Sequence, residues 1–209
     1  MPIRAILFDA DGVLQYATDD FEQRIEAVLG FLPSPIEDFK RDVFAAERPT
    51  LTGGNVVEAL GPVMTRWGAA GRAEPLVRSW WTSIVVDSGV VGLIGQLRAS
   101  GYLCALATNQ QSLRADYMRS QLGYDEVFDR CFYSCDVGLA KPDADYFRNI
   151  ADALTLAPAE LFFVDDHERN VAGARAAGLV AERFVNNRTT LAAGELRTLL
   201  LASGVTLTG

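Results

Sequence analysis

The fold of this chain is decided by the stretch Leu7-Phe8-Asp9-Ala10-Asp11-Gly12-Val13, where a short apolar run stops abruptly at an aspartate. A run of this kind, here residues 3–8, is typical of a buried parallel strand whose following loop carries chemistry. Two later apolar runs end at polar pairs in the same way: residues 102–107 before Thr108-Asn109, and residues 161–164 before Asp165-Asp166. We therefore expect three buried strands with polar carboxyl ends.

Helical patterns alternate with these runs along the second half of the chain. They cover residues 90–100, 113–122, 146–154 and 170–177, with weaker strand candidates at residues 131–134 and 179–185. Gly101, Gly123 and Gly178 stand where glycine commonly ends a helix. The alternation predicts an α/β fold, with a Rossmann-like parallel sheet and helices on both of its faces.

The segment from residue 15 to residue 82 breaks this alternation. It shows no convincing strand, but it has four helical stretches at residues 21–29, 36–46, 55–67 and 74–81. The alternative is an ordinary crossover grown long, yet the segment is far longer than a crossover between parallel strands needs. We expect an inserted α-helical cap domain at residues 15–82, on a Rossmann-like core made of residues 1–14 and 83–209.

Composition excludes several classes of function. The chain has 209 residues with 19 Lys+Arg against 27 Asp+Glu, a net charge of −8, and 49% hydrophobic residues. This balance argues against disorder and against nucleic-acid binding, which rewards clustered Lys and Arg. No apolar run is long enough to span a bilayer, and residues 1–4 lack a signal-peptide profile, so no membrane partner is expected. Cys104, Cys131 and Cys135 form no C-x-x-C pair, which fits a reduced, cytoplasmic setting. The oligomeric state is not indicated.

Four carboxylates are expected to meet at one edge of the sheet. In open α/β sheets, ligands bind at the carboxyl ends of the strands, where Asp9, Asp11, Asp165 and Asp166 fall. Like charges at short range raise one another's pKa, so such a cluster calls for a cation. Ligation by oxygen alone suits Mg²⁺. Lys141 begins the segment that precedes the helix expected at residues 146–154 and the strand expected at residues 161–164. Its ammonium is suited to holding a phosphate beside an anionic nucleophile.

Four motifs, in order and with matching spacing, resemble those of the haloacid dehalogenase (HAD) superfamily of aspartate-nucleophile hydrolases. They are Leu7-Phe8-Asp9-Ala10-Asp11-Gly12-Val13, Leu106-Ala107-Thr108-Asn109, Lys141-Pro142-Asp143-Ala144-Asp145-Tyr146-Phe147 and Val164-Asp165-Asp166-His167-Glu168-Arg169-Asn170. Each motif alone is short, and it is the set of four over the chain that is specific.

The resemblance implies a catalytic role for three residues. Asp9 would be the nucleophile that forms an aspartyl-phosphate. Asp11 would protonate the leaving oxygen and then activate water. Lys141 would stabilise both the substrate phosphate and Asp9.

The resemblance also implies phosphate and metal ligands. Thr108 would donate its hydroxyl to a phosphate oxygen, with Asn109 nearby. Mg²⁺ would be held by Asp9, by the backbone carbonyl of Asp11 and by Asp166, with Asp165 in an outer or water-mediated role. Asn170 would orient the loop.

The function that follows is a Mg²⁺-dependent phosphatase acting on a small phosphorylated metabolite, with sugar phosphates suggested by family analogy. A phosphomutase or phosphotransferase would use the same four motifs. Haloacid dehalogenases of the superfamily lack an acid/base aspartate at the position of Asp11, which disfavours that reaction. A catalytically silent regulatory protein is disfavoured because Asp9, Asp11 and Lys141 are all present.

Other conspicuous residues have simpler interpretations. His167 is expected to be a loop residue at the rim of the site, because Asp11 already supplies the acid/base group. Cys131 and Cys135 lack further ligands for a metal site and are expected to be free thiols. Trp80-Trp81 could line a substrate entrance, but packing within the cap is the favoured interpretation.

Overall fold

The computed structural model describes residues 2–207 and contains a five-stranded parallel sheet with strand order β5-β4-β1-β6-β7. The strands are β1 (Ala5–Phe8), β4 (Leu103–Thr108), β5 (Arg130–Tyr133), β6 (Leu161–Asp165) and β7 (Val180–Arg183). Each overlaps a strand expected from the sequence. The three strands with polar ends lie side by side, because β1 pairs with β4 on one side and with β6 on the other.

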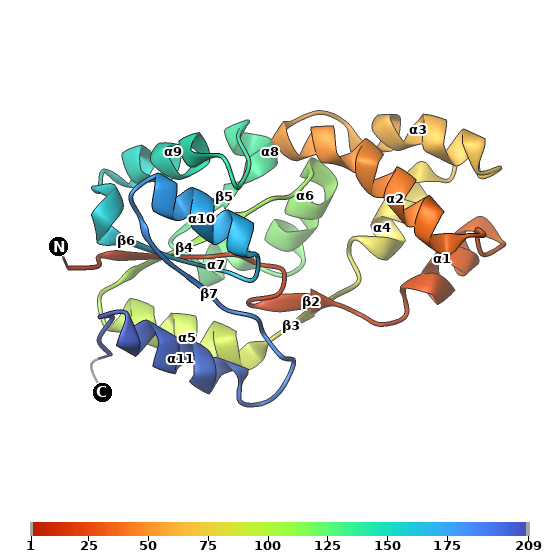
Figure 1. Ribbon diagram of the computed structural model, residues 1–209. Helices are drawn as coiled ribbons and strands as arrows, with labels where there is room; N and C mark the ends of the chain where they lie inside the picture. Colours follow the sequence, from red (N-terminus) through yellow and green to blue (C-terminus); the bar gives the residue numbers. More distant parts are fainter. Residues whose placement is uncertain (1, 208–209) are drawn as a thin grey trace.

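Helices cover both faces of the sheet, as Figure 1 shows. Ile6 and Phe8 of β1 pack into a core with α5 (Ser88–Ala99), α6 (Ser112–Ser120), α7 (Tyr124–Val127) and α11 (Ala192–Ala202). Ala5 and Leu7 point to the other face, which is covered by α9 (Ala144–Leu154) and α10 (Glu168–Ala176). Successive side chains of a strand point to opposite faces, so a strand buried on both sides is apolar throughout. The predicted α/β fold is confirmed.

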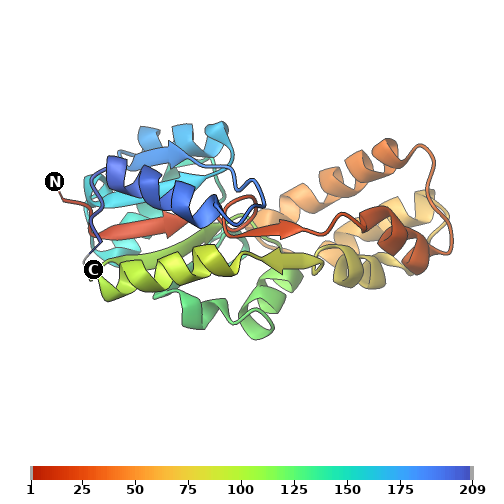
Figure 2. The ribbon, with the colours of Figure 1, turned by 90° about the horizontal axis from the view of Figure 1, so that it is seen from below.

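Four helices form a separate lobe, which we call the helical block. They are α1 (Phe21–Leu29), α2 (Ile36–Glu47), α3 (Val56–Arg66) and α4 (Ala73–Trp80), with a 3-10 turn η1 (Arg48–Thr52) after α2. They enclose their own apolar cluster, centred on Phe39, Leu60, Met64 and Leu76. Figure 2 shows this lobe beside the sheet, at the end where the chain leaves β1. All four helices overlap the helical stretches expected from the sequence.

One expectation for residues 15–82 is wrong, because this segment does begin with a strand. β2 (Gln15–Ala17) pairs antiparallel with β3 (Ile84–Val86), and this short ribbon joins the sheet lobe to the helical block (Figure 2). Three residues are too few to show the alternation by which a strand is recognised. The division into a core of residues 1–14 and 83–209 and a cap of residues 15–82 stays a prediction.

The remaining elements are short. They are α8 (Ser134–Val137) and the 3-10 turn η2 (Pro158–Glu160). None of the helices within residues 2–207 is both long and apolar enough to cross a membrane.

The packing of α10 against the loop after Lys141 gives a test of the fold. A Cβ added at Gly173 would overlap the carbonyl oxygen of Pro142 and lie 2.9 Å from its carbonyl carbon. Because both partners are backbone, we expect Gly173→Ala to lower the free energy of unfolding by about 1–3 kcal/mol. The measurement is denaturant-induced unfolding followed by circular dichroism.

Gly95→Ala is the matched control. Gly95 is an exposed residue inside α5 with nothing within 4 Å of its added Cβ. There the substitution is expected to raise stability by up to about 1 kcal/mol, as alanine does in a helix interior. Equal effects of the two substitutions would contradict the close approach of α10 to Pro142.

Candidate active site

The carboxyl ends of β1, β4 and β6 bring the sequence motifs together. Phe8 is in register with Leu106 of β4 and with Val164 of β6, so Asp9, Thr108 and Asp165 stand at one edge of the sheet. All three are buried. The backbone N–H of Asp9 donates to the carbonyl of Val164 at 2.9 Å, which carries the pairing of β1 with β6 one residue beyond the strand.

Lys141 lies between two of these carboxylates. Its ammonium Nζ is 2.7 Å from Asp9 Oδ1 and 2.7 Å from Asp165 Oδ2. The side chain of Lys141 is only 1% exposed, and the side chains of Asp9 and Asp165 are 9% and 0% exposed. Two carboxyl groups therefore share one positive charge in a nearly dry environment, where charge interactions are strong.

Asn109 fixes the backbone at Lys141. Its amide nitrogen donates to the carbonyl of Lys141 at 2.8 Å, and its amide oxygen accepts from the Lys141 N–H at 2.9 Å. Both of these hydrogen bonds of Asn109 are made with the backbone of the loop that carries Lys141. The structure places it as a brace for the lysine, and the predicted contact of Asn109 with substrate stays a prediction.

The environment of Asp9 disfavours the charged form of its carboxyl group. Burial raises its pKa to about 8, although the positive charge of Lys141 lowers it, and Asp165 adds to the rise. The pKa of Asp165 is lowered, because Lys141, the His167 N–H and Asn170 outweigh the effect of burial. His167 N donates to Asp165 Oδ1 at 2.8 Å, and Asn170 Nδ2 lies 3.0 Å from both carboxylate oxygens. Asp165 is therefore an anion with a full set of hydrogen-bond partners, whereas the charged form of Asp9 is disfavoured.

Asp11 forms a second, separate ion pair. Arg114 Nη1 and Nη2 donate to the two oxygens of Asp11 at 2.7 and 2.8 Å, which is the bidentate geometry of strong pairs. Gln15 and Gln110 each donate to the same carboxylate at 3.0 Å. Burial would raise the pKa of Asp11, but Arg114 and the two glutamines together hold it below its ordinary value. Asp11 is present as a carboxylate.

Gln110 connects Thr108 to the ion pair of Asp11. Thr108 is 1% exposed at the end of β4, and its hydroxyl accepts from Gln110 Nε2 at 3.1 Å. The same Nε2 donates to Asp11, so Gln110 spans the space from Thr108 to Asp11. The hydroxyl of Thr108 keeps its own hydrogen to donate, as the predicted phosphate contact requires.

The donor set at this edge fits a small hard cation. Gly12 has no Cβ, and a Cβ there would overlap the carboxylate of Asp166, so Asp166 lies directly against the turn after Asp9. The side chain of Asp166 is 20% exposed, whereas that of Asp165 is fully buried and partnered. Oxygen ligands from Asp9, Asp11 and Asp166 suit Mg²⁺, and Asp166 is the more accessible of the two neighbouring aspartates.

His167 lies at the rim, as expected. Its side chain is 70% exposed and its Nδ1 contacts Asp166 Oδ1, a contact that raises the pKa of the imidazole. Asp165, Asp166 and His167 have ligand atoms within 4.8 Å of one another. Cys104, Cys131 and Cys135 are free thiols, as predicted.

Sequence reasoning missed four residues around Asp11. Arg114, Gln110 and Gln15 contact its carboxylate directly, and Glu47 at the end of α2 is 9% exposed beside Arg114. Burial raises the pKa of Glu47 to about 7, opposed by Arg114 and by a hydrogen bond from Trp81. Arg114 Nε also donates to the carbonyl of Trp81 at 2.8 Å, which ties α6 to the end of the helical block. The signal available was the polar pair Gln110-Gln111 directly after Thr108-Asn109.

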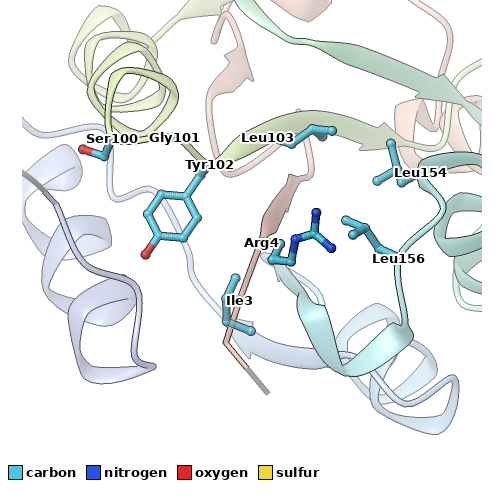
Figure 3. A pocket seen from close by; sticks show the side chains of 8 residues that line it. All are labelled: Ile3, Arg4, Ser100, Gly101, Tyr102, Leu103, Leu154 and Leu156. Carbon is cyan, nitrogen blue, oxygen red and sulfur yellow. The ribbon is translucent and has the colours of Figure 1, made fainter.

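A cavity of about 460 Å³ opens beside Asp11, between the sheet lobe and the helical block. Trp80 and Trp81 line it, and they also pack within the helical block, as favoured from the sequence; their place at a substrate entrance stays a prediction. A second hollow of about 410 Å³ lies at the opposite, amino ends of β1 and β4, where Arg4, Leu154 and Leu156 approach one another in Figure 3. It contains none of the motif residues.

Residues 3–178 match the family of haloacid dehalogenase-like hydrolases. Because this match covers most of the chain, the protein belongs to that family, and the enzyme class predicted from the motifs is confirmed.

Three phosphatases are among its relatives. A sesquiterpene phosphatase, astK, from Aspergillus oryzae is 28% identical over 114 residues, which are 54% of this chain but only 57% of that protein. A phosphoglycolate phosphatase from Xanthomonas campestris pv. campestris is 26% identical over 184 residues, 84% of this chain and 80% of that protein. An N-acetylmuramic acid 6-phosphate phosphatase from Pseudomonas putida is 28% identical over 184 residues, 85% and 81% of the two chains.

Solved structures share the fold. A HAD family enzyme from Bacteroides thetaiotaomicron, in complex with magnesium and inorganic phosphate, has a TM-score of 0.74 at 18% identity and covers 90% of this chain and 97% of its own. An L-2-haloacid dehalogenase from Xanthobacter autotrophicus has a TM-score of 0.64 at 18% identity, covering 98% and 84%. Identities this low show the fold alone.

Because Asp9 and Asp165 differ in their favoured charge state, replacing each by asparagine is expected to have a different effect on stability. Without a divalent cation, Asp165→Asn is expected to lower the free energy of unfolding by about 2–3 kcal/mol, because a fully hydrogen-bonded charge is lost. Asp9→Asn is expected to leave it unchanged or raise it. The measurement is denaturant unfolding in the presence of a chelator.

The pH dependence has a defined sign. The pKa of Asp9 in the folded chain, about 8, is above its unfolded value of about 3.9. Ionising Asp9 therefore costs folding free energy that builds up as the pH rises from about 4 to 8. The free energy of unfolding of Asp9→Asn, relative to that of the wild-type protein, should therefore be higher at pH 8 than at pH 5. A loss of stability from Asp9→Asn as large as that from Asp165→Asn would contradict this.

Proposed function

We propose that this protein is a Mg²⁺-dependent phosphatase that hydrolyses a small phosphorylated metabolite through an aspartyl-phosphate intermediate on Asp9. The observation that carries the proposal is the buried carboxylate of Asp9, which has Lys141 Nζ at 2.7 Å from one oxygen and the acid/base candidate Asp11 two residues away. The three phosphatases among its relatives, with substrates as different as a sesquiterpene phosphate and phosphoglycolate, support a phosphate ester as substrate.

In the first half-reaction, a carboxylate oxygen of Asp9 attacks phosphorus and the bond from phosphorus to the leaving oxygen breaks. We assign the attack to Oδ2, because Oδ1 already accepts from Lys141 Nζ and from the Ala10 N–H, both at 2.7 Å. Lys141 offsets negative charge on Asp9 and on the phosphate while they approach. The Thr108 hydroxyl donates to a phosphate oxygen and orients it.

The leaving oxygen takes its proton from Asp11, and the product alcohol departs. In the second half-reaction, water attacks the aspartyl-phosphate, Asp11 takes the proton from that water, and the bond between phosphorus and Asp9 breaks to release inorganic phosphate. The carboxylate form of Asp11, held by Arg114, is the form that this second step needs. The first step needs the protonated form, so the pair with Arg114 has to loosen when substrate binds.

Asp9, the backbone carbonyl of Asp11 and Asp166 would hold Mg²⁺, with Asp165 in an outer role. When bound, the ion neutralises the carboxylates and the phosphate oxygens. The likeness in fold to a structure that contains magnesium and phosphate is compatible with this assignment. We also propose that residues 15–82 act as a cap, which excludes water from the site and contacts the leaving group.

Replacing the nucleophile tests the proposal. Asp9→Asn is expected to lower kcat for 4-nitrophenyl phosphate by about 10³-fold or more, the scale of loss when a nucleophile is removed. Initial rates of nitrophenol release at saturating Mg²⁺ measure it. Retained turnover would contradict the assignment of Asp9.

Asp116→Asn is the control. Asp116 lies on the surface of α6 with its side chain 75% exposed, so the same chemical change there should leave kcat unaffected.

Chelation should stop turnover of the wild-type protein and added Mg²⁺ should restore it. Turnover that persists without metal would favour the chemistry of the dehalogenases.

A further inference from the structure

A cavity opens beside Asp11, on the side where a leaving group protonated by this residue would lie. This inference rests on the proposed function, in which Asp11 protonates the leaving oxygen. The side chain of Asp11 is 41% exposed, and it faces the cavity of about 460 Å³ between the two lobes. The volume is within the range of small-molecule sites, about 300–1,000 Å³. Whatever is bonded to the leaving oxygen extends from Asp11 into this space.

Three aromatic side chains of the helical block form one wall of the cavity. Phe44 has its ring 5.3 Å from Trp80 and 6.1 Å from Trp81, and the two tryptophan rings are 4.7 Å apart. Phe44 is 43% exposed, so part of its ring is accessible to a ligand in the cavity. Val185, 49% exposed, lines the cavity from the sheet lobe.

In the substrate-free chain each arginine that lines the cavity already has a carboxylate partner, and Glu47 stays beside Arg114 when the pair with Asp11 loosens. Arg114 forms its bidentate pair with Asp11 and has Glu47 beside it. Arg188 lies 4.7 Å from the centre of the Tyr16 ring and contacts Asp19 Oδ1 at 2.7 Å. A substrate with a second anionic group would have to compete with these carboxylates for its partner.

Two polar side chains of the wall, Asn186 and Ser83, are also engaged. Asn186 donates to the carbonyl of Val13 at 2.9 Å and to Asp87 Oδ2 at 2.8 Å. The hydroxyl of Ser83 is in contact with that of Thr18. These contacts hold the linking segments together and occupy donors that the hydroxyl groups of a sugar would need.

We propose that the substrate is the phosphate monoester of a neutral alcohol with an apolar carbon body, which packs against Phe44, Trp80, Trp81 and Val185 while the phosphate meets Asp9 and Lys141. The chemistry of the wall disfavours a leaving group that carries a carboxylate or several hydroxyls. Apolar contact in such a pocket contributes to transition-state binding in proportion to the area removed from water.

Ethyl and octyl phosphate test this, because both release a primary alcohol and differ chiefly in apolar length. We expect kcat/KM with Mg²⁺ to be at least about tenfold higher for octyl phosphate than for ethyl phosphate. We also expect kcat/KM to be higher for octyl phosphate than for 2-phosphoglycolate or glucose 6-phosphate. Equal values for the two alkyl esters, or a preference for either hydrophilic ester, would overturn the proposal.

Two substitutions locate the effect. Phe44→Ala is expected to reduce the octyl-to-ethyl ratio of kcat/KM by about threefold or more, because part of the apolar wall is removed. Phe31→Ala is the matched control, since Phe31 has a similar exposure of 37% in the helical block but does not line the cavity. An unchanged ratio in Phe44→Ala, or an equal fall in both variants, would overturn the assignment of this wall.

Failure of this inference differs from failure of the proposed function. If the wild-type protein releases no phosphate from any ester, including 4-nitrophenyl phosphate, the phosphatase proposal falls and the leaving-group proposal falls with it. If it hydrolyses these esters but prefers 2-phosphoglycolate or glucose 6-phosphate, only the leaving-group proposal falls.

Discussion

The shared ammonium of Lys141 is the interaction on which the rest of this structure depends. One positive charge lies 2.7 Å from two carboxylates, and all three groups are nearly excluded from water. Removing Lys141 would leave the two buried carboxyl groups without a counter-charge, which is strongly destabilising. The surroundings are accordingly specific: Asn109 clamps the backbone of Lys141, and α10 comes so close to the following Pro142 that position 173 has room only for glycine.

This arrangement also separates the roles of the carboxylates. Asp165 receives bonds from Lys141, from a backbone N–H and from Asn170, so it is stable as an anion and serves to position the lysine. Asp9 receives less support, and burial holds its pKa far above the ordinary value. Its charged form is the one that a bound cation beside it would stabilise. Asp11 belongs to a different network, in which Arg114 joins it to the carbonyl of Trp81 at the edge of the helical block. Chemistry at Asp11 and the position of that block are therefore physically connected.

Much of this could be predicted from local sequence. Three strands, β1, β4 and β6, are short apolar runs with clear ends, while β5 and β7 matched weaker patterns. The rules of parallel sheets place Asp9, Thr108 and Asp165 at one edge once the strands are known. The two strands of the linking ribbon were not predicted, since β2 and β3 have three residues each and pair across the whole helical block. Arg114, Gln110 and Gln15 escaped notice because they look like ordinary polar residues near a helix start or a loop. Arg114 and Gln110 reach Asp11 across about a hundred positions of sequence, which no local pattern records, whereas Gln15 is four residues from Asp11 and contacts it through the turn after β1. Asn109 was recognised as part of the site, but its bonds to the Lys141 backbone become visible only when the two loops are brought together.

The central claim is that Asp9 becomes covalently phosphorylated, and the most direct test is to trap that state. Asp11→Asn should slow the breakdown of the intermediate, because no base remains to activate water. After this variant is mixed with 4-nitrophenyl phosphate and Mg²⁺ and quenched in acid, mass spectrometry should find one phosphoryl group on the peptide containing Asp9. The group should be absent from the variant that also carries Asp9→Asn. A phosphoryl group on any other residue, or turnover by Asp11→Asn without a covalent species, would contradict the account.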